Sequence, residues 1–326
     1  MENPVWLAPL AGVTFPSTRL FFRGLGAGLV HTEMISCAGL VHGSRRTFSM
    51  LKTAEGERPV VLQLFAPDTA TLHEGARRAL SCSSFEAIGI NMACPMPKVT
   101  RKGAGSSLLG RPEVAAAMVR SLAPLGLPVW VKTRKSPAAS SMDTLAFSGM
   151  LLEAGASHIC IHGRFPAQKY GGRADKSVVI DAAKAFPGMI AASGDIFSPE
   201  DALEMLEEGC SAVFIARGAM KDPFLIPAIL DRCGFSVDAG LLTPPLGSRV
   251  DLMISLGESV SNEEGEKAAV VLLKRLLSGM FRGFSGAPRF RQAVSDTSDW
   301  RGISKALEEC RPSPERGELS DRRKVT

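Results

Sequence analysis

The chain has 326 residues, of which 45% are hydrophobic, and a formal net charge of +5. So much apolar sequence excludes a disordered chain, and so mild a charge cannot by itself argue for a nucleic-acid partner. The seven cysteines form no CxxC pair and no Cys/His cluster, which favours a reduced, cytoplasmic protein over a metal site or a disulfide framework.

The N-terminal stretch MENPVWLAPLAGV has no basic segment, contains Glu2 and is interrupted by Pro9, so it does not predict a signal peptide. No stretch approaches the roughly 18 apolar residues that a membrane span requires. We therefore expect neither a membrane nor a metal among the partners of this chain.

Short apolar runs then alternate with amphipathic segments. The runs predict eight β-strands, at residues 4–10, 28–35, 59–65, 87–94, 128–134, 158–164, 189–196 and 212–218. Residues 112–126, 146–156 and 198–210 are typical of the helices between them. The last of these begins with Ser198 as N-cap and Pro199 at the first helical position.

Eight strand–helix units with continuous apolar strands predict an α/β fold, a closed parallel (β/α)8 TIM barrel. The alternative is an open doubly wound sheet, but the sequence PLAGVTFP after the first strand lacks the expected GxGxxG turn. After Leu230 the rhythm stops and the remainder predicts helices. We expect a barrel over residues 1–235, a small helical C-terminal domain over 245–312 that caps the barrel or contributes a binding surface, and a flexible tail over 313–326.

Polar side chains are concentrated at the C-terminal ends of the predicted strands, where this fold gathers its functional groups. They are Gln63, Asn91, Cys94, Lys132, Arg134, His162, Arg164, Asp195 and Arg217. Small residues at 193–195 and 216–218 follow the seventh and eighth strands, where backbone N–H groups and Arg217 can approach an anion. These two turns predict a site for a phosphorylated ligand or cofactor.

The predicted loops after strands two, four, five and six are basic. They carry Arg45, Arg46, Lys98, Arg101, Lys102, Lys135, Arg164, Lys169, Arg173 and Lys176. Four positively charged loops at one rim of the barrel predict that its mouth binds a polyanion. The segment from Lys267 to Arg291 contains no acidic residue, and we expect it to extend this basic surface.

Six separated motifs carry a resemblance to a known family. They are APLAGVTFPSTR, NMACPMPKVTRKGAGSSLL, VKTR, IHGRFPAQKYGGRAD, SGDI and FIARGAMKDPF, and together they extend over roughly residues 4–230. In order and spacing they resemble the dihydrouridine synthases, which are FMN-dependent barrel enzymes that reduce specific uridines in tRNA. The resemblance implies FMN as cofactor, NADPH or NADH as reductant, and tRNA as partner of a chain that we expect to be a monomer.

The resemblance also implies residues that contact the substrate. Cys94 would protonate C5 of the uracil, and a thiol suits this role because its ordinary pKa of roughly 8.5 leaves it protonated at neutral pH. Asn91 would hydrogen-bond the uracil edge. The RNA would be held by Lys98, Arg101, Lys102, Arg134 and Arg164.

A second set of implied residues contacts the cofactor. Ala8, Pro9 and Leu10 would pack on the isoalloxazine ring, while Gln63 and Lys132 would bind its polar edge. A cation there stabilises the anionic reduced flavin. His162 would lie between flavin and substrate. The ribityl phosphate would be held by Ser193, Gly194, Asp195, Ala216 and Arg217.

Three features depart from the family pattern. Ala93 replaces a usual glycine, Ser193 replaces a usual asparagine, and TRKS stands after Lys132 where the family usually has a longer RTG turn. Three other functions stay open. They are the same chemistry on ribosomal RNA, a small-molecule flavoenzyme of the dihydroorotate or dihydropyrimidine dehydrogenase type, and an RNA-binding protein without catalysis. A small substrate does not require four basic loops, and the presence of Cys94 and Lys132 argues against lost catalysis.

Overall fold

The computed structural model describes residues 2–281, 283–284 and 286–311, so the tail predicted over 313–326 lies outside the described residues. The chain divides into two compact units. The first extends to Ala219 and includes Leu225–Ser236, and the second comprises Met220–Phe224 and the chain from Val237 onward.

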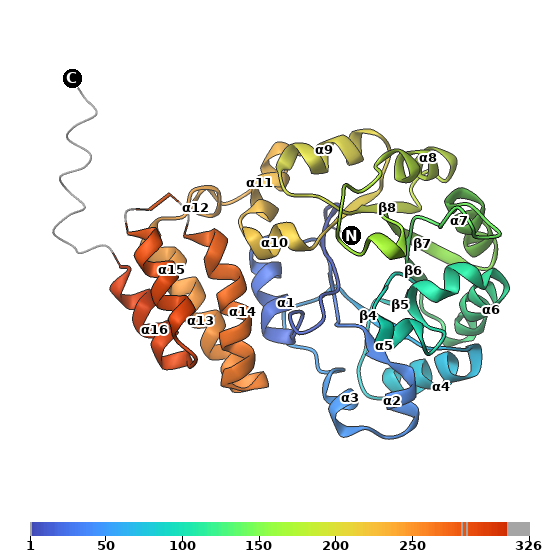
Figure 1. Cartoon of the computed structure of the whole chain (residues 1–326), viewed down its shortest axis with the longest axis horizontal. Coiled ribbons are helices and arrows are strands. Elements are labelled where there is room, and N and C mark those ends of the chain that lie inside the picture. Colours follow the sequence, from blue (N-terminus) through green and yellow to red (C-terminus); the bar gives the residue numbers. More distant parts are fainter. Residues whose placement is uncertain (1, 282, 285, 312–326) are drawn as a thin grey trace. The chain divides into compact units, whose positions relative to one another are not determined.

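The first unit is built on a parallel sheet that closes on itself (Figure 1). Its strands are β1 (Val5–Leu7), β2 (Val30–His31), β3 (Ile35–Ser36), β4 (Val60–Phe65), β5 (Ala87–Asn91), β6 (Val129–Arg134), β7 (Ala156–His162), β8 (Ile190–Ser193) and β9 (Ala212–Ile215). They pair in the order β1-β9-β8-β7-β6-β5-β4-β2. A bridge between Trp6 and Leu29 joins the first strand to the residues before β2 and completes the ring. The (β/α)8 barrel predicted from the sequence is confirmed.

The second barrel strand, predicted as one run over 28–35, is broken into β2 and β3. His31 pairs with Val61, and Ile35 pairs with Leu64. The second barrel strand therefore advances by four residues where β4 advances by three. The extra residue is accommodated at Thr32, whose hydroxyl oxygen accepts the Gln63 N–H at 2.9 Å. Such a bulge bends the strand and redirects the side chains that follow it.

Helices cover the outside of the barrel (Figure 1). They are α1 (Pro16–Gly24), α2 (Cys37–Val41), α3 (Arg45–Ser49), α4 (Thr69–Leu80), α5 (Pro97–Thr100), α6 (Pro112–Leu122), α7 (Thr144–Glu153), α8 (Ser177–Ala185), α9 (Pro199–Glu207), α10 (Arg217–Lys221) and α11 (Leu225–Arg232), with 3-10 turns η1 (Gly105–Gly110), η2 (Ala123–Leu125) and η3 (Pro166–Gln168). The predicted start of α9 is confirmed. The Ser198 hydroxyl accepts the Asp201 N–H, and Pro199 is the first helical residue.

Aromatic rings fill the middle of the barrel. Trp6 and Trp130 stack with their ring centroids 5.2 Å apart, and Phe214 meets Trp6 edge-on. His31 and His158 lie among these rings, and burial lowers their pKa values to about 3 and about 4. Both histidines are therefore neutral at physiological pH, and this layer forms an uncharged floor beneath the mouth of the barrel.

The second unit is helical. Its elements are α12 (Ala239–Leu242), α13 (Leu246–Glu264), α14 (Glu266–Met280), α15 (Ala287–Asp296) and α16 (Trp300–Glu309). Gly257 lets α13 approach α16, because a Cβ there would lie 2.2 Å from the Trp300 ring. No helix among the described residues is long and apolar enough to cross a membrane.

Candidate active site at the mouth of the barrel

A pocket opens at the C-terminal ends of the strands, which we call the mouth pocket. It is lined by Ala8, Pro9, Leu10, Ala11, Met34, Gln63, Asn91, Ala93, Cys94, Pro95, Met96, Lys132, Arg134, His162, Tyr170, Ser193, Gly194, Asp195, Ile196, Phe197, Phe214, Ala216, Arg217 and Gly218. All but four of the candidate site residues lie here. The exceptions are Lys98, Arg101, Lys102 and Arg164.

Strand register explains why these side chains meet. Asn91 on β5 pairs with Lys132 on β6, and His162 on β7 pairs with both Arg134 and Ser193. Successive side chains of a strand point to opposite faces, so Trp130, Lys132 and Arg134 all point inward. Trp130 belongs to the aromatic floor, while Lys132 and Arg134 reach the pocket above it.

The turn that carries Cys94 is built by Asn91. The Asn91 side-chain oxygen accepts the N–H groups of Ala93 at 3.2 Å and of Cys94 at 2.9 Å. Its amide nitrogen donates to Gln63 Oε1 at 3.0 Å. In this structure the Asn91 side chain therefore fixes the cysteine relative to the neighbouring strand β4.

Gly105 explains why a glycine follows the basic loop. Its φ is +63°, and a Cβ there would lie 2.6 Å from the Cys94 carbonyl oxygen and 2.9 Å from Val99. The Cys94 carbonyl accepts the Ser106 N–H at 3.0 Å, so η1 packs directly against the cysteine backbone. A side chain at position 105 would displace that contact.

The Cys94 thiol is partly buried and is not in a disulfide. Burial raises its pKa, while a hydrogen bond to the Met96 backbone and the charge of Arg134 act in the opposite direction. A raised pKa keeps the thiol protonated at neutral pH, which gives the pocket a proton donor rather than a thiolate nucleophile.

Lys132 brings an unneutralised cation to the pocket. Its ammonium donates to Ser193 Oγ at 3.1 Å and lies 3.7 Å from Cys160 Sγ. Within the part of the chain that the structure describes, no carboxylate is paired with it. Burial lowers its pKa, as expected for a charge held away from water without a counter-ion. The site therefore favours a ligand with a negative or electron-rich edge.

His162 is buried beside these cations, and its Nδ1 has no hydrogen-bond partner among the described residues. Burial and the nearby charges of Lys132 and Arg134 lower its pKa to about 2. The ring is neutral, and its unpaired nitrogen is available to a ligand.

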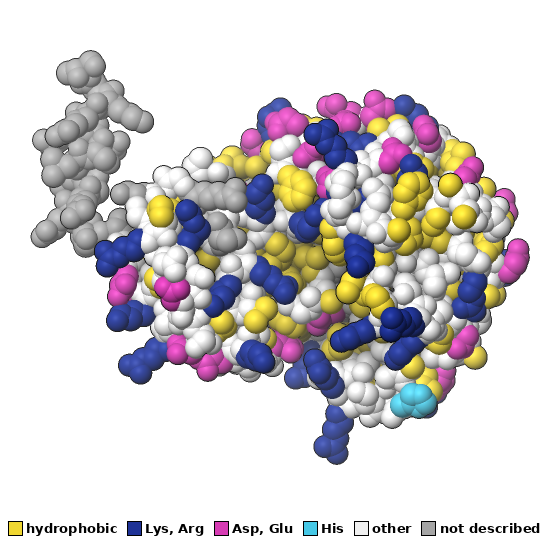
Figure 2. Space-filling view, in the orientation of Figure 1, with side chains coloured by type: hydrophobic (Ala, Val, Ile, Leu, Met, Phe, Trp, Pro, Cys, Tyr) yellow, Lys and Arg dark blue, Asp and Glu magenta, His cyan; other side chains and the backbone are white. Residues whose placement is uncertain are grey.

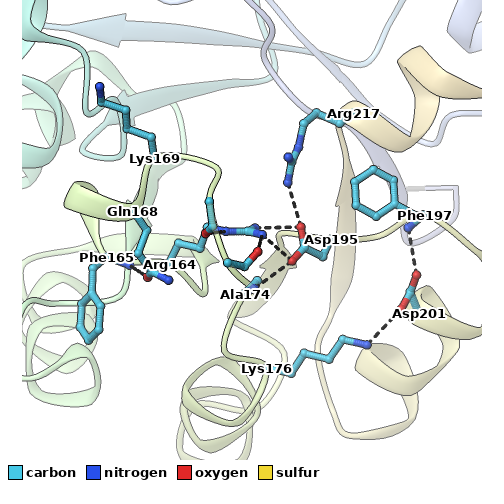
Figure 3. A network of polar contacts seen from close by, with 12 residues as sticks. Arg164, Phe165, Gln168, Lys169, Ala174, Lys176, Asp195, Phe197, Asp201 and Arg217 are labelled. Carbon is cyan, nitrogen blue, oxygen red and sulfur yellow. Dashed lines mark hydrogen bonds and ion pairs between the residues drawn. The ribbon is translucent and has the colours of Figure 1, made fainter. Parts of the chain in front are cut away.

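Figure 3 shows how the loops after β7, β8 and β9 are tied together. The buried Arg164 guanidinium donates to both oxygens of Asp195, at 2.8 and 2.7 Å. Arg217 donates to Asp195 Oδ1 at 2.8 Å, and the Ala174 N–H donates to Oδ2 at 2.8 Å. Arg164, predicted to hold RNA, thus lies within this network, and Asp195 orients Arg217.

The rim outside the pocket is basic in fewer places than the sequence suggested. Lys135 pairs with Asp175, and Lys176 pairs with Asp201 and Glu204. The exposed cations on and after α5 are Lys98, Arg101 and Lys102, which we call the α5 basic cluster. Figure 2 shows Lys and Arg side chains gathered in the region of α5 and α3.

Similarity to known proteins assigns the chain to a family. A family model described as "Dihydrouridine synthase (Dus)" matches residues 6–313. The chain belongs to the dihydrouridine synthase family. Among the described residues of this family member, no group of three or more His, Cys, Asp or Glu side chains is placed to hold a metal ion.

Curated relatives of this family member have names that include tRNA-dihydrouridine synthase. A "Probable tRNA-dihydrouridine synthase 1" of Synechocystis sp. is 36% identical over 232 residues, which cover 70% of this chain and 65% of that one. "tRNA-dihydrouridine synthase B" of Pseudomonas aeruginosa is 32% identical over 306 residues, covering 92% of this chain and 90% of that one. The match to the Synechocystis protein thus falls just short of two thirds of that relative's length.

Among solved structures, that of morphinone reductase in complex with tetrahydroNAD is similar with a TM-score of 0.50. The sequence identity is 14%, and the match covers 74% of this chain and 90% of that one. At this identity the likeness concerns the barrel fold alone.

Several pocket residues of this family member were not singled out from the sequence. They include Met96, Tyr170, Phe197 and Phe214. Alternation along β9 could have indicated Phe214, which lies two residues from Ala216 on the inward face. Tyr170 is the chain's single tyrosine and precedes two glycines, but only the loop structure shows that it faces the pocket.

Proposed function

We propose that this protein is an FMN-dependent tRNA-dihydrouridine synthase that uses NADPH or NADH to reduce the C5=C6 bond of specific uridines, with Cys94 as the proton donor. The observation that carries the proposal is the mouth pocket, which combines a thiol whose pKa is raised by burial with a partly buried ammonium group that has no carboxylate partner among the described residues.

The pocket residues fit a flavin nucleotide. Ala8, Pro9 and Leu10 form an apolar wall for a flat ring system, and the Lys132 ammonium suits its electron-rich edge together with Gln63. The unpaired Nδ1 of His162 provides a further polar contact. A ribityl phosphate would be held by Ser193, Gly194, Ala216, Arg217 and the backbone of Asp195. The Asp195 carboxylate would fix the Arg217 guanidinium rather than touch the phosphate.

When bound, FMN supplies the hydride, obtained from the dinucleotide, that adds to C6 of the uracil. Cys94 donates the proton that C5 requires, which balances the two-electron reduction. Asn91 holds the cysteine backbone, so that the thiol keeps its place while the base enters and leaves. Burial keeps the thiol protonated until the base arrives.

The α5 basic cluster and Arg134 are proposed to hold the RNA around the extruded uridine. The helical segment 245–312 adds RNA contacts in this proposal, and a single chain is the active species. Arg164 supports the site from within the ion-pair network, and its substitution would act through Asp195 and Arg217.

The test compares purified wild-type protein with Cys94→Ala and, as a matched control, the exposed Cys82→Ala. We expect a flavin spectrum that bleaches with NADPH in all three proteins. Dihydrouridine in unmodified tRNA, counted by mass, should form with wild type and Cys82→Ala, and should fall by about 10²- to 10⁴-fold with Cys94→Ala.

Three other outcomes of these assays would each favour a different function. Dihydrouridine in ribosomal RNA but not in tRNA would change the substrate. Reduction of a free pyrimidine that is insensitive to salt would indicate a small-molecule flavoenzyme. A colourless protein that binds tRNA would indicate an RNA-binding protein without catalysis.

A further inference from the structure

Tyr170 is an exposed aromatic ring that the reaction described above does not use. It is 57% exposed, although it lines the mouth pocket beside Arg134 and Arg217. Large exposed aromatic side chains that border a pocket are commonly contact points for a ligand.

The loop that carries Tyr170 is fixed on both sides of the ring. Arg134 donates to the Lys169 carbonyl at 3.0 Å, immediately before Tyr170. Arg164 donates to the carbonyls of Gly171 at 3.0 Å and Gly172 at 2.6 Å, immediately after it. Both arginines are almost fully buried, at 3% and 2% exposure.

Burying two guanidinium groups is costly unless they are well bonded. Arg134 also donates to the Ala93 carbonyl and Arg164 to Asp195, and the remaining bonds of both groups go to the backbone that flanks one exposed residue. Lys169 also adopts a left-handed conformation, with φ of +50°, which is unfavourable for a lysine. The backbone that carries the ring is therefore held in place before any ligand arrives, so ordering the loop costs little on binding.

The surroundings of the ring suit a nucleobase. The Arg134 and Arg217 guanidinium groups lie 5.8 and 5.0 Å from the Tyr170 ring centroid. Phe197, 40% exposed, also lies beside Arg217, whose guanidinium is 5.3 Å from the Phe197 ring. Aromatic faces next to arginines stack bases and attract the phosphates that accompany them.

A groove next to the pocket shows where the rest of such a ligand could run. It shares Pro95 with the mouth pocket and is lined by loops that follow β5, β6 and β7. The lining includes Thr100, Ser106, Ser107, Ser140, Ser141, Pro166 and Lys169. Hydroxyl groups suit the ribose 2′-OH and phosphate oxygens of RNA. Figure 3 shows Lys169 extending away from the Asp195 network.

We propose that Tyr170 is a pre-organised stacking platform for the nucleobase that adjoins the target uridine in the RNA strand, with the strand continuing into the neighbouring hydroxyl-lined groove. The proposal rests on the proposed function, since it takes RNA as the substrate. A nicotinamide dinucleotide is the competing occupant, and the test separates the two.

The experiment uses the flavin-loaded enzyme with Tyr170→Ala, Tyr170→Leu and Tyr170→Phe. Phe235→Ala is the control, because Phe235 is also an exposed aromatic residue, at 39%, and does not line the pocket. Binding of unmodified tRNA is measured over a range of salt concentrations. Flavin reduction by NADPH is followed separately by the loss of absorbance, and dihydrouridine formation is counted by mass.

We expect Tyr170→Ala and Tyr170→Leu to weaken tRNA binding by about 5- to 150-fold, the effect of losing one base–aromatic stack. Tyr170→Phe and Phe235→Ala should remain within about twofold of wild type. The slope of log K against log salt should stay unchanged, because stacking releases no counter-ions. Reduction by NADPH should be unaffected.

Unchanged tRNA binding in Tyr170→Ala would overturn the proposal, as would a loss equal to that of Phe235→Ala. Slower reduction by NADPH with unchanged tRNA binding would assign the ring to the dinucleotide instead. Failure of the wild-type enzyme to form dihydrouridine would refute the proposed reaction, while the binding comparison would still decide the role of Tyr170.

Discussion

Asp195→Asn tests whether the network in Figure 3 stabilises the barrel. The Asp195 carboxylate accepts hydrogen bonds from Arg164, Arg217 and the Ala174 N–H, and Arg164 is 2% exposed. Removing one partner of a buried ion pair costs about 3–5 kcal/mol. Because the Asp195 side chain is 21% exposed and Arg164 keeps its bonds to two backbone carbonyls, we expect a loss of about 3 kcal/mol.

For a unit of this size, that loss lowers the Tm by about 6–12 °C. The assay is thermal unfolding followed by tryptophan fluorescence, since Trp6 and Trp130 both lie inside the barrel. Asp175→Asn is the control, because its pair with Lys135 is more exposed and surface pairs contribute about 1 kcal/mol or less. Equal Tm values for the two variants would refute the reasoning.

The pH dependence gives a second check on the same pair. Burial acts to raise the pKa of Asp195, but the hydrogen bonds from Arg164 and Ala174 outweigh it, and the pKa is lowered. A carboxylate with a lowered folded-state pKa contributes stability above its unfolded pKa of about 3.9 and loses it as pH falls through the folded value. The Tm difference between wild type and Asp195→Asn should therefore be complete near neutral pH and shrink below about pH 4.

Three further predictions concern the mouth pocket and its rim. Gly105→Ala should lower the free energy of unfolding by about 1–2 kcal/mol, because φ is positive at this position, and should displace Cys94. Dihydrouridine formation should then fall while the flavin spectrum remains, and normal turnover would contradict this. Lys132→Met should raise the Tm of the flavin-free protein, since it removes a partly buried charge that has no carboxylate partner, and should weaken flavin binding, measured by fluorescence titration. Unchanged affinity for the flavin would refute this. Replacing the α5 basic cluster by alanines should reduce the salt slope of tRNA binding by about 2–3, against no change for the distant Lys184→Ala.

The sequence by itself determined the barrel and the residues of its mouth. Eight apolar runs separated by helical segments allow few other arrangements, and a parallel barrel brings all strand ends to one rim. Cys94, Lys132 and His162 could therefore be placed together without coordinates, because local apolar patterns in the sequence are enough to locate the strand ends. The break at Thr32 could not be predicted, since a bulge depends on the register with β4.

Only the tertiary structure decided what the charged side chains do. In the sequence, Arg164 and Lys98 look alike as basic residues of rim loops. In the fold, Arg164 is buried against Asp195, 31 residues away, while Lys98 is exposed on α5. Tyr170 faces the pocket because Arg134 and Arg164 hold the backbone on either side of it. Pairings between distant loops depend on where three-dimensional packing brings them, and no local pattern in the chain records that.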